Sequence, residues 1–306
     1  MTATVSASPP PAAPIAPAAG TFAGRIAVVL EMIKFPHTVF ALPFALTGMW
    51  LAAGGPPQGR ALLWVAAAMV GARSAALAFN RVADRRLDAA NPRTADRALP
   101  AGRLSVRFAW GFTACSAALF VLAAAMLNPL CVALTPLALA VILGYSYCKR
   151  FTAASHFVLG LALGMAPVGG WLAVSGSFAL PPLLLCAAVA TWTAGFDILY
   201  ACQDIDFDRR SGLHSIPARL GAAAALRLAR GLHAAMVAAL LALAPAMELG
   251  GVYLAGVAAA AALLLTVHAL VSPSDLRRLD LAFFRVNAWV GVAVFAFTAA
   301  DLWVRS

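Results

Sequence analysis

The chain has 306 residues, of which 63% are hydrophobic and only 11% are charged, and its mean hydropathy is +0.88. These values exclude a soluble globular domain, in which about a quarter of the residues are charged. The formal net charge is +10, but the basic residues lie mainly between apolar stretches. This placement indicates membrane topology and contact with anionic lipid, and it does not indicate nucleic-acid binding.

The first 24 residues are rich in Ala and Pro and contain no charged side chain. A signal peptide needs a basic region ahead of an unbroken apolar stretch, and repeated Pro prevents a regular helix. We therefore expect residues 1–24 to form a disordered leader without a catalytic role. Residues 25–306 are expected to form one transmembrane domain.

Nine apolar stretches follow, each close to the roughly 20 residues that a helix needs to cross a bilayer core of about 30 Å. They lie near 26–52, 60–83, 107–127, 129–147, 154–174, 181–203, 222–245, 249–271 and 281–303. Gly, Pro or charged residues occupy the breaks between them, for example Asn128-Pro129 and Gly176. The sequence thus predicts an all-α polytopic membrane protein with nine transmembrane helices.

The basic residues predict the orientation of these helices. They gather before the first stretch and at the second, fourth, sixth and eighth breaks, whereas Arg60 and Arg305 alone lie on the other face. Cytoplasmic loops carry the excess of Lys and Arg in membrane proteins. We therefore expect the amino terminus and the even-numbered breaks to be cytoplasmic, in a bacterial-type inner membrane.

Seven of the twelve acidic residues form two clusters, each at the end of an apolar stretch. The first cluster has three members and the second has four: Asp84, Asp88 and Asp96, then Asp197, Asp204, Asp206 and Asp208. Both of these stretches are expected to end on the cytoplasmic side.

Helical spacing orders most of these acids into two polar stripes. Successive members of the first stripe are seven, four and four residues apart, and those of the second are three, four and four apart. The stripes are Arg73, Asn80, Asp84 and Asp88, then Asp197, Tyr200, Asp204 and Asp208. Residues at these spacings share one face of a helix. Asp96 and Asp206 fall off the stripes and are expected to be supporting charges.

Carboxylates that face one another in a low dielectric repel strongly, so they require cations. Hard oxygen ligands suit Mg²⁺, which commonly binds one or two carboxylates together with substrate phosphates, and Arg binds diphosphate directly. Metal and Arg together stabilise a departing pyrophosphate. The pattern predicts a Mg²⁺-dependent site for a diphosphate attached to an apolar group, such as a prenyl diphosphate.

Two other interpretations of the acids remain open. They are solvated loop charges at helix ends, or they line an ion or proton pathway. Two D-x-x-x-D motifs on the same face weigh against loop charges. The pathway is disfavoured because transport helices carry their acids near midspan, whereas all but Arg73 and Asp197 lie at the helix ends. The five cysteines and five histidines lack metal-ligand spacing.

A basic, Pro-containing link follows each acidic cluster, at residues 98–104 and 215–221. Each link leads from an acidic helix end into the next apolar stretch. We expect the links to fold over the site as a cap, unless they are simply two similar cytoplasmic loops.

The motifs resemble those of the UbiA superfamily of intramembrane aromatic prenyltransferases, from about Arg25 to the C-terminus. The resemblance rests on three segments: Asn80-x-x-x-Asp84-Arg-x-Leu-Asp88, Asp197-x-x-Tyr200 continued through Asp204-x-x-x-Asp208, and Tyr145 through Lys149-Arg150. It implies a nine-helix bundle around a central cavity with a cytoplasmic cap.

The resemblance also implies roles for the matched residues. A Mg²⁺-diphosphate would bind between the two motifs, with the ligands Asn80, Asp84, Asp88, Asp204 and Asp208. The allylic diphosphate would ionise to a carbocation, which an electron-rich aromatic ring would capture. Asp197 and Tyr200 are expected to position the acceptor or to shield the cation.

Basic residues and one Tyr complete the implied site. The candidates for binding the diphosphate or an acceptor carboxylate are Arg73, Tyr145, Lys149 and Arg150, with Lys34 a weaker one. Arg81 departs from the family pattern, because quinone-pathway members often carry an acid directly after the Asn.

The predicted function is transfer of a polyprenyl group from prenyl diphosphate to an aromatic acceptor, 4-hydroxybenzoate, in ubiquinone-type quinone biosynthesis. One alternative is a menaquinone-pathway prenyltransferase that acts on a related aromatic acid. A remoter alternative is a cation-coupled transporter. The expected partners are the two substrates and the lipid bilayer; the sequence indicates neither nucleic acid nor an obligate protein partner.

Overall fold

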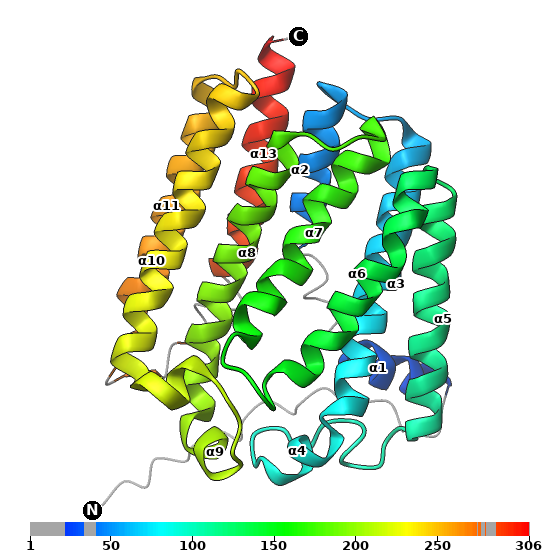
Figure 1. Ribbon diagram of the computed structural model, residues 1–306, viewed down its shortest axis with the longest axis vertical. Coiled ribbons are helices and arrows are strands. Elements are labelled where there is room, and N and C mark those ends of the chain that lie inside the picture. Colours follow the sequence, from blue (N-terminus) through cyan, green and yellow to red (C-terminus); the bar gives the residue numbers. More distant parts are fainter. Residues whose placement is uncertain (1–21, 34–40, 274, 277–278, 280–285, 306) are drawn as a thin grey trace, which may run out of the picture.

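The computed structural model describes residues 22–33, 41–273, 275–276, 279 and 286–305, and within them the chain is almost entirely helical (Figure 1). The helices are α1 (Phe22–Met32), α2 (Leu42–Ala53), α3 (Gly59–Ala83), α4 (Arg85–Ala90), α5 (Val106–Ala125), α6 (Pro129–Cys148), α7 (Ser155–Ser175), α8 (Leu180–Ala201), the 3-10 turn η2 (Cys202–Asp204), α9 (Ile205–Arg210), α10 (Ile216–Ala246), α11 (Gly251–Leu270) and α13 (Asn287–Arg305). Residues 1–21 of the predicted leader lie outside the described residues, and residues 22–24 begin α1.

Eight helical segments of the described chain are long and apolar enough to cross a membrane, one of them formed by α8, η2 and α9 together. The predicted all-α polytopic membrane fold is therefore confirmed. The count of nine is not, because the first predicted stretch, 26–52, is not one helix. α1 ends at Met32 and α2 begins at Leu42, while residues 34–40 lie outside the described part. α2 has 12 residues, which span about 18 Å.

The helix ends follow from local sequence signals. Asn128 and Ser215 accept hydrogen bonds from backbone N–H groups in the first turns of α6 and α10, which satisfies donors that have no partner inside a helix. Pro43 lies in the first turn of α2, where its fixed φ is tolerated. Gly54 and Gly176 end α2 and α7 with φ of 69° and 66°, a conformation that Gly adopts without a Cβ clash.

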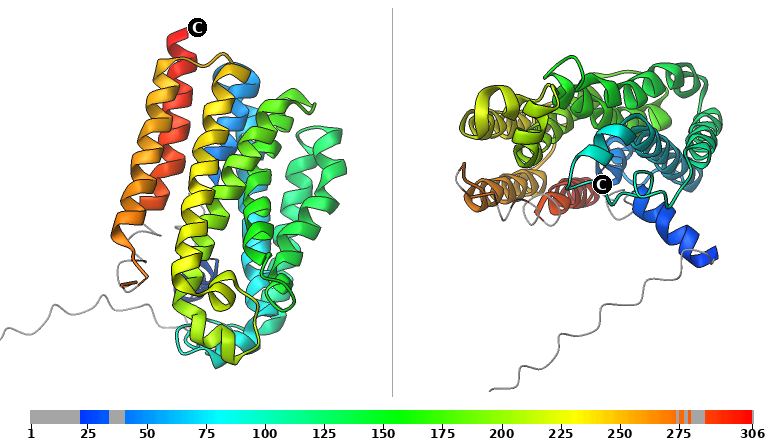
Figure 2. Two further views of the ribbon diagram at one scale, coloured as in Figure 1. Left: turned by 60° about the vertical axis from the view of Figure 1, so that its left-hand side comes forward. Right: turned by 90° about the horizontal axis from the view of Figure 1, so that it is seen from below.

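The helices pack in two groups (Figure 2). α2, α7, α8, α10, α11 and α13 contact one another in that order, and α13 returns to α2, so this group closes on itself. α3, α5 and α6 pack together and against α7. Small residues permit the closest approaches: a Cβ on Gly170 would lie 2.1 Å from the carbonyl oxygen of Ala45. Such close backbone contact is typical of helices that associate inside membranes.

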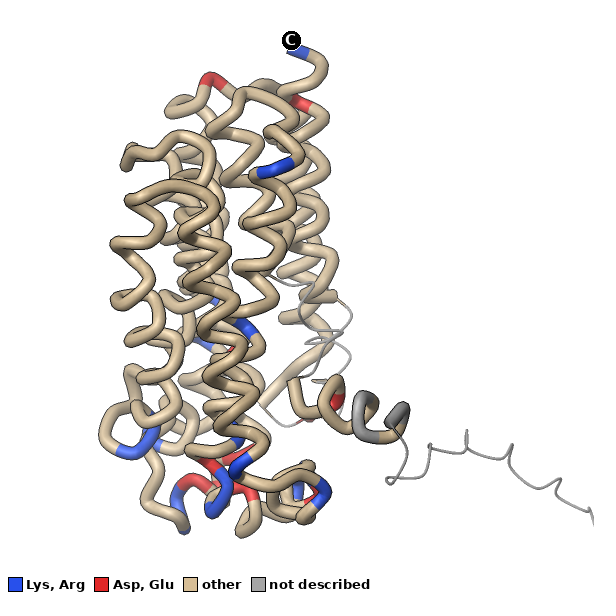
Figure 3. Tube along the Cα trace, turned by 90° about the vertical axis from the view of Figure 1, so that its right-hand side faces the viewer, with Lys and Arg blue, Asp and Glu red and all other residues tan. Residues whose placement is uncertain are grey.

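Charged residues gather at one end of the bundle, the end that carries α4 and α9 (Figure 3). The opposite end carries few, among them Asp301, which accepts hydrogen bonds from the N–H groups of Gly250 and Tyr253 at the start of α11. The polar chemistry of the described chain is therefore concentrated at the α4–α9 end.

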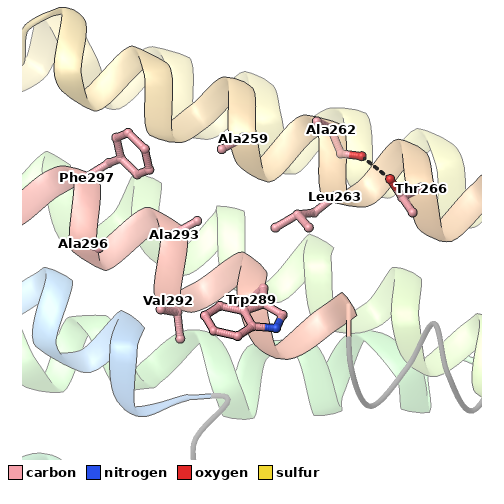
Figure 4. A pocket seen from close by; sticks show the side chains of 9 residues that line it. All are labelled: Ala259, Ala262, Leu263, Thr266, Trp289, Val292, Ala293, Ala296 and Phe297. Carbon is pink, nitrogen blue, oxygen red and sulfur yellow. Dashed lines mark hydrogen bonds between the residues drawn. The ribbon is translucent and has the colours of Figure 1, made fainter.

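A groove of about 570 Å³ lies between α11 and α13 (Figure 4). Its lining is apolar except for Thr266, whose hydroxyl donates to the carbonyl oxygen of Ala262. No ionisable side chain lines this groove, so it does not suit diphosphate chemistry, and the candidate site lies at the charged end.

Candidate active site

The first acidic motif lies where α3 passes into α4. Asp84 ends α3, and Asn80, one turn earlier, donates from Nδ2 to Asp84 Oδ2 at 2.9 Å. Asn80 and Asp84 thus lie one turn apart at the end of α3, but the predicted single-helix stripe does not continue to Asp88, because the helix breaks at Asp84 and α4 begins at Arg85. The second stripe is also divided, since η2 separates α8 from α9. Arg150, two residues after the end of α6, contacts Asp84 Oδ1 at 3.2 Å. Burial and the nearby Asp88 carboxylate raise the pKa of Asp84, so a cation bound here would stabilise its charged form.

Asp88 lies in α4, is 6% exposed, and is held between two guanidinium groups. Arg97 donates to its Oδ1 at 2.6 Å, and Arg81 lies 3.7 Å from its Oδ2. That second oxygen is buried and accepts no hydrogen bond from the described residues. A buried carboxylate oxygen without a full partner is suited to bind a cation.

The second motif follows the end of α8. Asp204 forms a two-point ion pair with Arg93, whose Nε and Nη2 lie 3.1 and 2.6 Å from the two carboxylate oxygens. Asn91 also donates to Asp204 Oδ1, at 3.1 Å. Because Asn91 and Arg93 follow α4, these bonds join the second motif to the segment that follows the first. The two motifs therefore lie at the same end of the bundle, and their meeting in one cavity stays a prediction.

Asp208 is fully buried. Lys149 lies 2.8 Å from its Oδ1, and Ser215 donates to its Oδ2 at 2.7 Å. The same Ser215 oxygen accepts from the N–H of Ala218 in the first turn of α10. Ser215 therefore connects the second acidic motif to the start of the next long helix.

Residues next to the two predicted links contact the acidic motifs. Asn91, Arg93 and Arg97, which precede the first link at 98–104, bind carboxylates of both motifs. Before the second link, His214 donates its backbone N–H to the carbonyl oxygen of Lys149 at 2.8 Å. Residues 216–221 of the second link form the first turns of α10, and the cap stays a prediction.

Further candidates lie deeper along the stripes. The Nε of Arg73 is buried without a hydrogen-bond partner. Tyr145 lies in the last turns of α6, next to Ser146, whose hydroxyl accepts a hydrogen bond from Asn80. Arg81, which the sequence marked only as a departure from the family pattern, is 7% exposed and pairs with Asp88.

Tyr200 and Asp197 occupy the last turns of α8. Arg93 donates from Nη1 to the Tyr200 hydroxyl at 3.0 Å and lies 5.1 Å from the centre of the Tyr200 ring. Asp197 pairs with His156 at 2.6 Å. Lys34, the weaker basic candidate, lies outside the described residues.

Sequence reasoning missed several side chains that complete the site: Asn91, Arg93, Arg97, His156 and Ser215. Arg93 and Arg97 had a signal, because they belong to the basic segment after the first cluster. His156 had none, since its partner Asp197 is 41 residues away and no ligand spacing connects them.

The carboxylates are a suitable donor set for a divalent metal ion, although they are arranged in pairs with cations. Among the described residues, no three His, Cys, Asp or Glu side chains are grouped as a metal site. Instead, the cations that contact the four motif carboxylates are Arg81, Arg93, Arg97, Lys149 and Arg150. Hard oxygen donors and the unpartnered Asp88 Oδ2 fit Mg²⁺, and binding it would require these cations to exchange partners.

Fold and site together define a polytopic helical membrane protein that carries a carboxylate- and guanidinium-lined centre at one end. Residues 41–299 match the model of the UbiA prenyltransferase family, and the chain belongs to this family. The predicted enzyme class, an aromatic prenyltransferase of an integral membrane type, is confirmed.

Curated relatives cover most of the chain. A 4-hydroxybenzoate octaprenyltransferase of Cupriavidus necator is 34% identical over 292 residues, which are 92% of this chain and 99% of the relative. The enzyme of the same name from Xanthomonas campestris is 36% identical over 259 residues, 84% of this chain and 85% of its own length.

Solved structures share the fold. The apo structure of a UbiA homologue from Aeropyrum pernix K1 is 39% identical, with a TM-score of 0.79 over 87% of this chain and 98% of that one. A UbiA homologue from Archaeoglobus fulgidus, solved with DMAPP and Mg²⁺, has a TM-score of 0.69 at 18% identity and covers 90% of this chain and 99% of its own.

Proposed function

We propose that this enzyme transfers a polyprenyl group from a prenyl diphosphate to the ring of an aromatic acid, 4-hydroxybenzoate, in a pathway of ubiquinone type. The observation that carries the proposal is the set of four carboxylates, each paired with a cation, at the charged end of an apolar bundle. The names of the curated relatives support 4-hydroxybenzoate as the acceptor. The Archaeoglobus fulgidus homologue bound to DMAPP and Mg²⁺ supports a divalent metal.

The site residues at the charged end form a metal-binding group and a diphosphate-binding group. Asn80, Asp84, Asp88, Asp204 and Asp208 would hold Mg²⁺, which when bound neutralises the diphosphate as its bond to carbon breaks. Lys149, Arg150 and Arg93, released from their carboxylate partners, bind the diphosphate oxygens. The apolar helices receive the prenyl chain and keep water from the allylic carbon.

The acceptor side lies deeper along the stripes. Arg73 carries a buried guanidinium nitrogen without a partner, which suits the carboxylate of an aromatic acid. Tyr145 lies at the end of α6, next to Ser146, which contacts Asn80, and Asp197 and Tyr200 occupy the end of α8. We assign these four residues to positioning the acceptor and to shielding the carbocation.

A related aromatic acid of the menaquinone pathway is the second candidate acceptor, because it carries the same carboxylate that Arg73 would bind. Arg81, a buried cation near Asp88, does not distinguish the two acids. Supplying a hydroxynaphthoic acid and 4-hydroxybenzoate in competition distinguishes the two through the product that forms.

The experiment supplies isolated membranes that contain the full chain with Mg²⁺, a polyprenyl diphosphate and the candidate acids. Prenylated aromatic product is expected, and it should be lost in Asp84→Asn and Asp208→Asn. Asp206→Asn is the matched control, because Asp206 is an exposed acid in the same motif. No product with any acid, from well-folded protein, overturns the function, and product that persists in both variants overturns the site assignment.

We also propose that the charged end faces the cytoplasm of a bacterial-type inner membrane, because Lys and Arg concentrate there (Figure 3). Impermeant thiol reagents test this orientation through single Cys residues placed in the two links. Labelling from the periplasmic side of intact cells would contradict it.

A further inference from the structure

His156 lies at the start of α7, is 2% exposed, and uses both ring nitrogens. Its Nδ1 lies 2.6 Å from Asp197 Oδ2 in α8. The backbone N–H of Ile216, the first residue of α10, donates to its Nε2 at 3.3 Å. One imidazole therefore connects three long helices.

These two bonds determine the tautomer of the ring. A nitrogen that accepts a hydrogen bond from a backbone N–H carries no proton, so Nε2 is unprotonated. The single ring proton of the neutral imidazole is then on Nδ1, which donates to Asp197. Protonating Nε2 would break the bond from Ile216 and leave an N–H without an acceptor at a helix start. The network thus favours a neutral His156 beside an ionised Asp197.

Asp197 has one buried partner, His156, and one accessible carboxylate oxygen. Its side chain is 32% exposed, whereas that of His156 is 3% exposed. His156 engages Oδ2, and among the described residues Asp197 Oδ1 accepts no hydrogen bond. One carboxylate oxygen is therefore fixed and the other is available to a bound molecule.

The start of α10 also contacts Asp208, one of the proposed metal ligands. Ser215, the residue before Ile216, donates to Asp208 Oδ2 at 2.7 Å and caps α10. The first residues of α10 therefore contact Asp208 through Ser215 and His156 through Ile216. A shift of this helix end would move both carboxylates together.

We propose that His156 is a positioning residue. It holds Asp197 as an anion with one carboxylate oxygen directed at the aromatic acceptor, and the start of α10 connects this pair to Asp208. The inference rests on the proposed aromatic acceptor. His156 does not contact substrate in this arrangement and acts only through Asp197.

Two substitutions each remove one of the two hydrogen bonds that the His156 ring forms. The amide nitrogen of Asn reaches the place of Nδ1, so His156→Asn retains a donor for Asp197 and loses the acceptor for Ile216. The amide oxygen of Gln reaches the place of Nε2, so His156→Gln retains the acceptor and loses the donor. His214→Gln is the matched control for His replacement, because His214 contacts Lys149 through its backbone N–H, which the substitution leaves in place.

The measurements are the kcat/KM for the aromatic acceptor, the KM for prenyl diphosphate and the thermal midpoint of the detergent-solubilised chain. In His156→Gln we expect acceptor kcat/KM to fall by about tenfold or more, the effect of losing one charge-assisted hydrogen bond. Its KM for prenyl diphosphate and its thermal midpoint should stay near wild type. His156→Asn should rescue acceptor kcat/KM while its thermal midpoint falls.

Wild-type acceptor kcat/KM in His156→Gln would overturn the proposal. Equal losses of acceptor kcat/KM and of thermal midpoint in both variants would also overturn it, since that result describes a purely structural His. In the Asp197→Asn background, replacing His156 should cause no further loss of kcat/KM.

Nitrogen NMR of ¹⁵N-His protein tests the pairing without turnover. The His156 signals, identified by their absence in His156→Asn, should show one protonated and one unprotonated ring nitrogen, and the protonated one should shift in Asp197→Asn. A doubly protonated ring would overturn the inference. If the wild type shows the expected signals but prenylates no acid, the proposed function fails while the His156–Asp197 pairing stands.

Discussion

Ser215→Ala removes one hydroxyl that serves two partners. In the wild type this hydroxyl caps α10 by accepting from Ala218, and it donates to Asp208, which is fully buried. Loss of an N-cap Ser costs about 1 kcal/mol, and loss of a hydrogen bond to a charged group costs roughly 1.5–3 kcal/mol. The two contributions together predict a loss of roughly 2.5–4 kcal/mol in the free energy of unfolding.

Ser105→Ala provides a matched control. Ser105 caps α5 by accepting from the N–H of Phe108 at 3.1 Å, and no carboxylate hydrogen bond to it is present in the described structure. Its replacement therefore predicts only the cap contribution, about 1 kcal/mol. Both variants lose a helix cap of the same kind, so the difference between them measures the bond to Asp208 together with the burial of Ser215.

Thermal unfolding of the detergent-solubilised full chain, followed by the fluorescence of its seven Trp residues, measures both effects. At about 2 °C per kcal/mol for a chain of this size, we expect a midpoint drop of roughly 5–8 °C for Ser215→Ala and roughly 2 °C for Ser105→Ala. Equal drops in the two variants would refute the reasoning, because they would mean that the Ser215–Asp208 bond contributes nothing to stability.

Further predictions concern packing, capping, ion pairing and metal dependence. Gly170→Ala should lower the free energy of unfolding by roughly 1–3 kcal/mol through overpacking, and the thermal midpoint should fall with it. Gly169→Ala, with no atom within 4 Å of its new Cβ, should leave the midpoint unchanged. Equal midpoints would contradict the close approach of α2 and α7. Asp301→Ala leaves two N–H groups at the start of α11 without an acceptor and should lower the same midpoint, and an unchanged midpoint would contradict this capping role. Arg93→Lys keeps the charge but loses the two-point bond to Asp204, so kcat/KM for prenyl diphosphate should fall by roughly tenfold or more; unchanged kinetics would remove Arg93 from the site. EDTA should abolish product formation and added Mg²⁺ should restore it, whereas activity that survives EDTA would contradict a metal-dependent site.

The sequence alone determined the class of fold, because the apolar stretches are long enough to cross a bilayer and must form helices there. It also placed Asn80 and Asp84 one turn apart, and their contact needs only the last turn of α3. The breaks at Asn128 and Gly176 were readable because capping and left-handed Gly conformations depend on a few neighbouring residues. The start of α10 was not, because this helix begins at Ile216, six residues before the predicted stretch.

Only the tertiary structure decided which cation holds which carboxylate. Arg93 reaches Asp204 across 111 residues, and His156 reaches Asp197 across 41, so both pairs depend on how the helices pack and not on spacing along the chain. The division of 26–52 into α1 and α2, in contrast, had a local signal, because the stretch contains Pro36 and Pro43 and Pro disfavours a helix interior. Local periodicity places residues on a face, and the packing of separate helices decides what that face meets.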